Sequence, residues 1–380
     1  PILLMPGGIS LSQLGVKPNF SALQNYQGWV KQVESVLSPN EVGNVMRRSF
    51  NALRNGPPGP VVVEMTSDVC SLQIPKDSEN YCSPRSAKVI PSQNDIRDAV
   101  KYLMKAKKPL IWAGGGVLMS GASKELKKLV EFTGIPVFST MQGKSAFDER
   151  HPLSLGAGCG TTTLAAHNWL KNSDVVLVLG SSLTRPPYGQ VLSSEKTLLH
   201  NTIDPEDLNK DESAMVGLVG DTKLTLLALM EEFKTEGFKK DNGEVTRIKK
   251  EINVLKKKWM QDWNPILNSG EIPLNYYRII IEIYKNIDPE NSIVTHDAGA
   301  PRDCMVPFYN ATLPNSYIGW GKTTHLGFGI PLMIGAKMAH PDKFCLNLMG
   351  HGAFGLSGLD LETSVRSELP ITTGLLTNAA

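Results

Sequence analysis

The chain has 380 residues, more than one hydrophobic core usually supports, so we expect two or three α/β units. Its 39 basic and 37 acidic residues leave a formal net charge of +2, which argues against nucleic acid or an anionic membrane as the main partner. With 41% hydrophobic residues, 20% charged residues and no apolar run of about 18 residues, the composition predicts packed cores and no membrane span.

Cysteine usage and the two chain ends lead to further expectations. The cysteines are odd in number, are widely scattered and lack the C-x-x-C spacing of a zinc site or a disulfide framework. They are Cys70, Cys82, Cys159, Cys304 and Cys345. We therefore expect reduced thiols and a cytoplasmic protein. The chain begins at Pro1 without a methionine and ends just after an expected strand, so we also expect further sequence at both ends.

The first predicted unit, residues 1–76, contains a helix that leads into a buried strand. Apolar residues at helical spacing predict a helix over 41–54, and Gly56-Pro57-Pro58-Gly59 ends it. The apolar run at 60–65 predicts the strand. A polar stretch at 77–92 has no periodicity, so we expect it to be a linker.

Residues 93–240 form the second predicted unit. Short β-rich runs alternate there with helical patterns, and this alternation predicts a parallel sheet with right-handed crossovers and flanking helices. The expected helices are 94–106, 121–133, 161–171 and 221–237, and the expected strands are 109–113, 135–138, 174–179, 198–203 and 215–219.

Residues 241–270 are expected to be a helical connector, and residues 271–380 to be a third α/β unit. The connector carries a lysine-rich helical pattern over 244–266, which we interpret as a solvated helix face. The third unit has expected helices at 275–286 and 358–368, a glycine-containing helix near 327–336, and expected strands at 292–296, 344–349 and 371–376.

A triple glycine follows the strand 109–113, at Gly114 to Gly116. Glycines at this place let a backbone approach a phosphate near a helix N-terminus. The dinucleotide fingerprint G-x-G-x-x-G fails here because its sixth position is Met119. A structural turn and a nucleotide contact therefore both stay open.

The segment from residue 344 to 378 carries a more specific signal. One strand ends at Gly350, and small residues and a helix follow it, so backbone N–H groups are available to hold a diphosphate. Asn378 comes 27 positions after His351, at the end of the next strand. Adjacent parallel strands would bring both ends to the carboxyl edge where α/β sheets bind ligands. A metal ion that bridges a diphosphate could be held from both strand ends.

At these motifs the chain resembles the thiamine-diphosphate-dependent enzymes, and in particular their acetolactate synthase-like branch. The resemblance covers essentially the whole chain. It implies that 1–76 closes a pyrimidine-binding domain, that 93–240 is a Rossmann-like central domain, and that 271–380 begins a diphosphate-binding domain. The motifs that carry it are residues 56–65 with Asp68-Val69, 151–156, 173–180, 326–331 and 350–354.

The resemblance also implies a set of site residues. His351, Asn378 and a backbone carbonyl near Ala380 would bind Mg²⁺. Leu326 would hold the cofactor in a bent shape. The residues that would contact thiamine diphosphate are Gly299, Ala300, Leu326, Gly350, His351, Gly352, Ala353 and Asn378.

Three departures from the family pattern bear on activity. His351 stands where the family has aspartate, and imidazole is a poor ligand for the hard Mg²⁺ ion, so metal affinity should fall. The histidine could instead contact the diphosphate directly or cap the helix. Thr377 replaces the first of a pair of asparagines. The family's catalytic glutamate would precede Pro1, so this chain alone is expected to be inactive.

The resemblance implies a carboligase or decarboxylase that acts on a 2-oxo acid and forms a homodimer or homotetramer. FAD is possible but not supported, because Arg185 is displaced from the arginine pattern of the flavin-binding members. One alternative is a degenerate, non-catalytic homologue that binds a cofactor or serves as a scaffold. Another is an NAD- or FAD-binding protein that uses the central domain.

Overall fold

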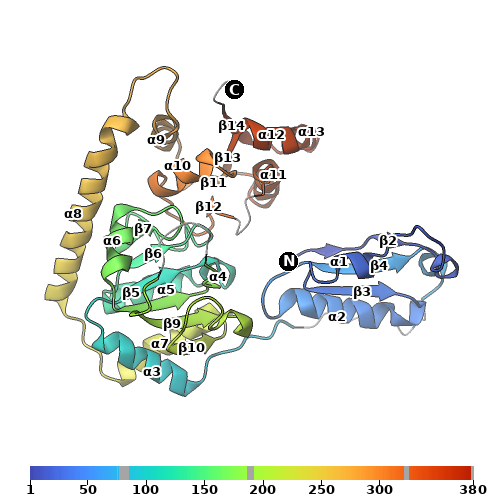
Figure 1. Ribbon diagram of the computed structural model, residues 1–380, viewed down its shortest axis with the longest axis horizontal. Helices are drawn as coiled ribbons and strands as arrows, with labels where there is room; N and C mark the ends of the chain where they lie inside the picture. Colours follow the sequence, from blue (N-terminus) through green and yellow to red (C-terminus); the bar gives the residue numbers. More distant parts are fainter. Residues whose placement is uncertain (75, 77–84, 186–191, 321–324, 378–380) are drawn as a thin grey trace. The chain divides into compact units, whose positions relative to one another are not determined.

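The computed structural model describes residues 1–74, 76, 85–185, 192–320 and 325–377, and the chain divides into two compact units (Figure 1). They are Pro1–Val89 and Ile90–Ala380. The division into the five segments expected above stays a prediction. Within the described residues, no helix combines the length and the apolar character that crossing a bilayer requires.

The first unit is a small parallel sheet built around β4 (Val61–Thr66), which pairs with each of the other strands. They are β1 (Leu3–Leu4), β2 (Gly7–Gly8) and β3 (Gln32–Val36). Its helices are α1 (Ala22–Tyr26) and α2 (Val42–Arg54). The predicted helix and strand of this unit are confirmed. β3 was missed, because its alternation of valine with polar residues covers only five positions.

The second unit contains two parallel sheets, of which the first has the order β10-β9-β8-β5-β6-β7. The central strand β8 is apolar and buried along its whole length, as expected for a parallel strand covered on both faces. The strands are β5 (Leu110–Ala113), β6 (Val137–Ser139), β7 (Ser154–Ala157), β8 (Val175–Leu179), β9 (Thr197–Thr202) and β10 (Val216–Val219). The helices are α3 (Gln93–Lys105), α4 (Gly115–Met119), α5 (Ser123–Thr133), α6 (Leu164–Asn172) and α7 (Thr222–Thr235).

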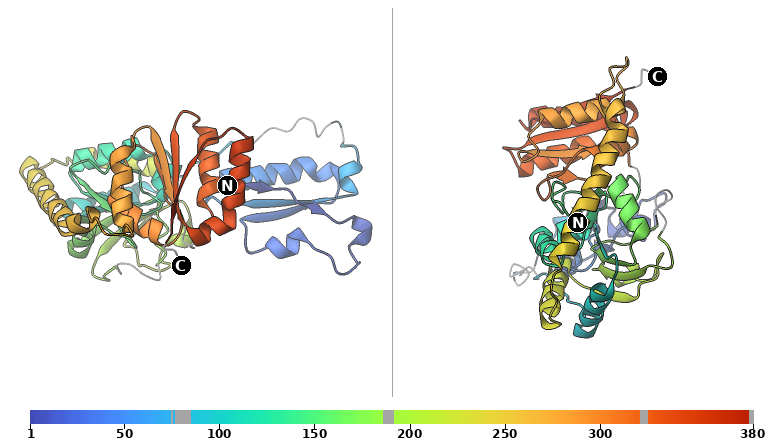
Figure 2. Two further views of the ribbon diagram at one scale, coloured as in Figure 1. Left: turned by 90° about the horizontal axis from the view of Figure 1, so that it is seen from above. Right: turned by 90° about the vertical axis from the view of Figure 1, so that its left-hand side faces the viewer.

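The second sheet of this unit has the order β12-β11-β13-β14. The long helix α8 (Asn242–Leu267) connects the two sheets and packs against α6 and α9 (Figure 2). The strands are β11 (Ser292–His296), β12 (Tyr317–Ile318), β13 (Phe344–Gly350) and β14 (Thr372–Leu376). The helices are α9 (Tyr276–Asn286), α10 (Ala300–Phe308), α11 (Gly329–Ala339), α12 (His351–Ser357) and α13 (Leu361–Arg366).

The strand β12 was not predicted, and two helical parts beside the second sheet also differ from the sequence prediction. The helix expected over 358–368 is α13 and ends at Arg366, and the separate helix α12 occupies the seven residues directly after β13. Helix α10 was missed because it contains Pro301 and Pro307. Pro301 lies in the first turn, where a missing backbone N–H costs no intrahelical hydrogen bond.

Candidate functional site

Three strand ends meet at one edge of the second sheet. β13 pairs with β14 in parallel, so that Gly350 lies opposite Leu376, and it pairs with β11 so that Leu348 lies opposite His296. The predicted adjacency of the strands that end near 350 and 376 is therefore confirmed. Asn378 and Ala380 lie outside the described residues.

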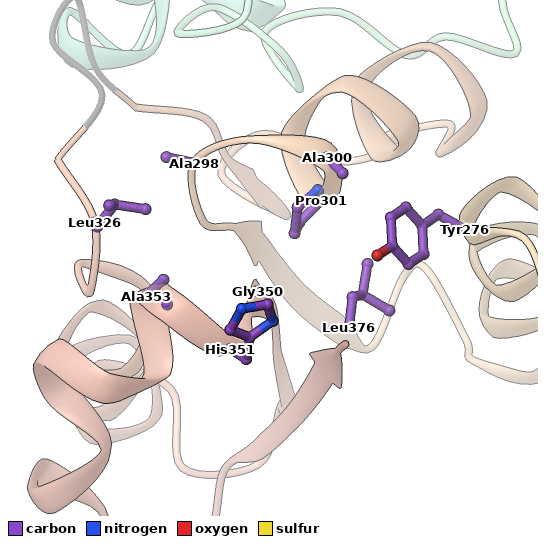
Figure 3. A pocket seen from close by; sticks show the side chains of 10 residues that line it. Tyr276, Ala298, Ala300, Pro301, Leu326, Gly350, His351, Ala353 and Leu376 are labelled. Atoms are coloured by element: carbon purple, nitrogen blue, oxygen red, sulfur yellow. The ribbon is translucent and has the colours of Figure 1, made fainter. Parts of the chain in front are cut away.

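A cavity of about 170 Å³ lies at this edge (Figure 3). Figure 3 shows the His351 ring between Ala353 and Leu376, facing Pro301. The cavity is lined by Tyr276, Ala298, Ala300, Pro301, Leu326, Gly350, His351, Gly352, Ala353 and Leu376. Of the eight residues predicted to contact the cofactor, six line the cavity, Gly299 lies between two lining residues, and Asn378 lies outside the described residues. Tyr276, Pro301 and Leu376 were missed, and no sequence motif marks them.

The start of α12 leaves its backbone open toward this cavity. Gly350 is the residue before the helix, and no side chain caps the first turn. A Cβ added to Gly352 would meet nothing within 4 Å, so the space beside this backbone is clear. Backbone N–H groups at such a strand-to-helix turn favour an anion.

Buried Asp297 holds the loop that forms the opposite wall. Its Oδ1 accepts the Ala298 N–H at 2.8 Å and the Gly327 N–H at 3.3 Å, and its Oδ2 accepts the Gly329 N–H at 3.0 Å. These bonds tie the end of β11 to the turn that carries Leu326. Both carboxylate oxygens are used inside the protein, so Asp297 positions the cavity wall. Its role was missed because two of the three donors, Gly327 and Gly329, lie about 30 residues further along the sequence.

His296 lies directly before this loop and is 1% exposed. Its ring stacks on Trp320 with centroids 5.8 Å apart and an interplanar angle of 17°, and its carbonyl accepts the Trp320 Nε1–H at 2.6 Å. Burial lowers the pKa of His296 from 6.5 to about 4. The imidazole is therefore neutral at pH 7.

The donor set of the cavity does not match a carboxylate-bound metal ion. No aspartate or glutamate is among its lining residues. Across the part of the chain that the structure describes, no three His, Cys, Asp or Glu side chains are grouped so that they could hold a metal. The cavity offers the imidazole of His351, whereas Mg²⁺ prefers hard oxygen ligands.

The triple glycine packs against the loop that follows β8, in the six-stranded sheet of the second unit. The Gly116 N–H donates to the Gly180 carbonyl at 2.8 Å, and a Cβ on Gly116 would lie 2.7 Å from the Gly180 Cα. Gly180 itself has a φ of +57°, which favours glycine. This contact supports the structural interpretation of the turn. Arg185, the displaced arginine, is engaged in an ion pair with Glu212 at 3.0 Å.

We expect Gly116→Ala to lower the free energy of unfolding by about 1–3 kcal/mol, because its methyl group would force the two loops apart. Gly160→Ala is the matched control, since an added Cβ there meets nothing within 4 Å. Urea unfolding of both variants measures the difference. A Gly116→Ala protein as stable as the wild type would contradict the close packing of the two loops.

Two family comparisons bear on this geometry. Residues 96–229 match "Thiamine pyrophosphate enzyme, central domain", and residues 297–380 match "Thiamine pyrophosphate enzyme, C-terminal TPP binding domain". Together the two matches cover more than half of the chain. The chain belongs to the thiamine pyrophosphate enzyme family. The C-terminal match contains every lining residue of the cavity except Tyr276, and thiamine pyrophosphate is another name for thiamine diphosphate.

Relatives of this thiamine pyrophosphate enzyme chain are acetolactate synthases. It is 30% identical over 400 aligned positions to the probable acetolactate synthase large subunit of Methanococcus aeolicus. That alignment covers the whole chain and 65% of the relative. It is 27% identical to the acetolactate synthase large subunit of Corynebacterium glutamicum, over 90% of the chain and 54% of that protein. It is 28% identical to the chloroplastic acetolactate synthase of Arabidopsis thaliana, over 90% of the chain and 51% of that protein. The chain therefore spans about half to two thirds of the length of these relatives.

Proposed function

We propose that the chain is part of a thiamine-diphosphate-dependent carboligase or decarboxylase of the acetolactate synthase type, acting on a 2-oxo acid. The observation that carries this proposal is the cavity at the aligned ends of β11, β13 and β14. It is built from small residues and open backbone, it contains no carboxylate, and it lies in the segment matched to a thiamine-pyrophosphate-binding domain.

Thiamine diphosphate, when bound, supplies an electron sink for the negative charge that decarboxylation leaves on carbon. The chain's own residues would bind and orient it. The backbone at Gly350, Gly352 and Ala353 would hold the diphosphate, together with the loop at Gly299 and Ala300. The side chains of Leu326, Leu376 and Tyr276 would cover the apolar part of the cofactor and exclude water.

The metal assignment stays a prediction of the sequence. We propose that Mg²⁺ binds weakly through His351, Asn378 and the Ala380 carbonyl, because His351 replaces a carboxylate and its negative charge.

We also propose that the protein forms a homodimer or homotetramer, as the resemblance implies. We propose a cytoplasmic location, as the scattered thiols indicate.

The proposal is tested by calorimetric titration of thiamine diphosphate with and without Mg²⁺. We expect wild-type binding that depends little on Mg²⁺, and a gain of about tenfold or more in Mg²⁺-dependent affinity for His351→Asp. His340→Asp makes the same charge change at an exposed position away from the cavity lining and should leave the affinity unchanged.

Thermal shift measurements with thiamine diphosphate, NAD and FAD complete the test. Stabilisation by thiamine diphosphate alone supports the proposal. A response to none of the three would indicate a non-catalytic scaffold, and a response to NAD or FAD alone would indicate a nucleotide-binding protein. If His351→Asp gains nothing from Mg²⁺ while the cofactor still binds, the assignment of position 351 is wrong.

A further inference from the structure

A second cavity, of about 310 Å³, lies at the other ends of α9 and α10, two of the helices that line the first one. Helix α9 contributes Tyr276 to the first cavity and Tyr284, about two turns later, to the second. Helix α10 contributes Ala300 to the first and Phe308 to the second. The remaining walls come from β7, α6 and α8, which Figure 1 shows on the same side of the second unit.

One side of this second cavity is apolar and aromatic. The rings of Trp259 and Phe308 are stacked with centroids 5.5 Å apart and an interplanar angle of 16°. Met260 and Ile281 extend this side, and the small residues Gly156, Ala157 and Ala165 line the cavity as well. An aromatic and apolar lining of this kind accepts an aromatic ring or another apolar group.

The polar side of the second cavity carries the ammonium group of Lys256, on which the carboxylates of Glu149 and Asp148 act from beyond ion-pairing distance. Lys256 Nζ donates to the Glu149 carbonyl oxygen at 3.2 Å, and no carboxylate of the described residues lies within ion-pairing distance of it. Burial lowers the pKa of the Lys256 ammonium group. An anion bound beside it would raise this pKa again, because an opposite charge favours the protonated form.

The other charged groups that line the cavity are already paired. The Glu149 carboxylate contacts Lys144 Nζ at 2.6 Å and accepts the Ala311 N–H at 2.8 Å. Arg150 pairs with Asp148 and with Glu290, each at 3.0 Å. The exposed amide of Asn310 lies on the same lining and makes no hydrogen bond within the described residues. Lys256, Asn310 and the indole N–H of Trp259, which is buried without a hydrogen-bond partner in the described residues, are therefore groups available to a ligand.

We propose that the second cavity binds a small monocarboxylate with an aromatic body. The ring would lie on Trp259 and Phe308, and the carboxylate would contact Lys256 and Asn310. One cation without a direct ion pair matches a single negative charge, and the cavity volume is at the lower end of small-molecule pockets, which suits a one-ring compound. This site is separate from the proposed cofactor site and does not depend on the proposed function.

Calorimetry with 3-phenylpropionate and 3-phenylpropanol tests the proposal, in the absence of thiamine diphosphate. The two probes share the ring and differ in the charged group. We expect the acid to bind at least about tenfold more tightly than the alcohol, since a half-buried cation discriminates strongly for an anion. Acid and alcohol binding equally well, or neither binding, would overturn the proposal.

Two variants locate the charge recognition. Lys256→Met should reduce acid affinity to the level of the alcohol, while Lys257→Met, at the exposed neighbouring position, should bind the acid as the wild type does. Asn310→Ala should weaken acid binding several-fold, because it removes one hydrogen-bond donor. It changes an exposed side chain, so it still tests the site if Lys256→Met does not fold. Unchanged acid binding in both Lys256→Met and Asn310→Ala would show that the acid binds elsewhere and would refute the site.

Discussion

Lys144→Met is expected to lower the free energy of unfolding by about 3–5 kcal/mol, the cost of leaving one member of a buried ion pair uncompensated. The side chains of Lys144 and Glu149 are 1% and 2% exposed, and Lys144 Nζ lies 2.7 and 2.6 Å from the two carboxylate oxygens of Glu149. Removal of the ammonium would leave the carboxylate inside the protein with the Ala311 N–H as its remaining donor.

This pair also joins the two sheets of the second unit. Lys144 and Glu149 lie between β6 and β7 of one sheet, and the Glu149 N–H donates to the carbonyl of Ala311, which precedes β12 of the other, at 3.0 Å. From the same loop, the Ser145 hydroxyl donates to the Tyr317 carbonyl at 3.1 Å. We therefore expect Lys144→Met to loosen the contact between the sheets as well as to destabilise the fold.

Urea unfolding followed by tryptophan fluorescence measures the effect of Lys144→Met. The double variant Lys144→Met, Glu149→Met should recover part of the loss, because it removes the unpaired carboxylate. Lys127→Met is the surface control, since Lys127 and Glu131 are 58% and 51% exposed and their pair is expected to contribute less than about 1 kcal/mol. If Lys144→Met costs no more than Lys127→Met, the buried pair does not have the role given to it here.

The second large effect is a loss of stability on acidification through His296. Its pKa is about 4 in the folded protein, against 6.5 for an unburied histidine, because burial disfavours the imidazolium. Between these two values the unfolded chain binds more protons than the folded one, so stability rises with pH and is lost as the pH falls from 6.5 toward 4. This difference between the pKa values of His296 in the folded and the unfolded protein corresponds to about 3 kcal/mol of unfolding free energy.

The His296 contribution is isolated by comparing unfolding free energies of the wild type and His296→Phe from pH 7 down to pH 4. The phenyl ring can keep the stacking on Trp320 but cannot take up a proton. We expect the wild type to lose about 3 kcal/mol more than the variant over this range. His340→Gln, which changes an exposed imidazole, should follow the wild type. Parallel curves for wild type and His296→Phe would contradict the assignment.

Much of the α/β pattern could be predicted from local sequence. The apolar runs at 174–179 and 344–349 are strands within a residue or so of their predicted bounds, because buried parallel strands are nearly continuous in apolar residues. Elements that depend on tertiary contacts were missed. β12 has two residues, and its pairing with β11 is what makes it a strand.

The sequence by itself determined which backbone segments could bind an anion, because the glycines and small residues after residue 349 and the loop at 297–300 are local features of the chain. Only the tertiary structure decided that Tyr276, Pro301 and Leu376 complete the cavity wall and that Asp297 secures it. It also decided that Lys256, which makes no ion pair with a described residue, lines the same cavity as Trp259 and Phe308. The physical reason is that periodicity reports the burial of one segment at a time, whereas a cavity and its charge depend on which distant segments the sheets bring together.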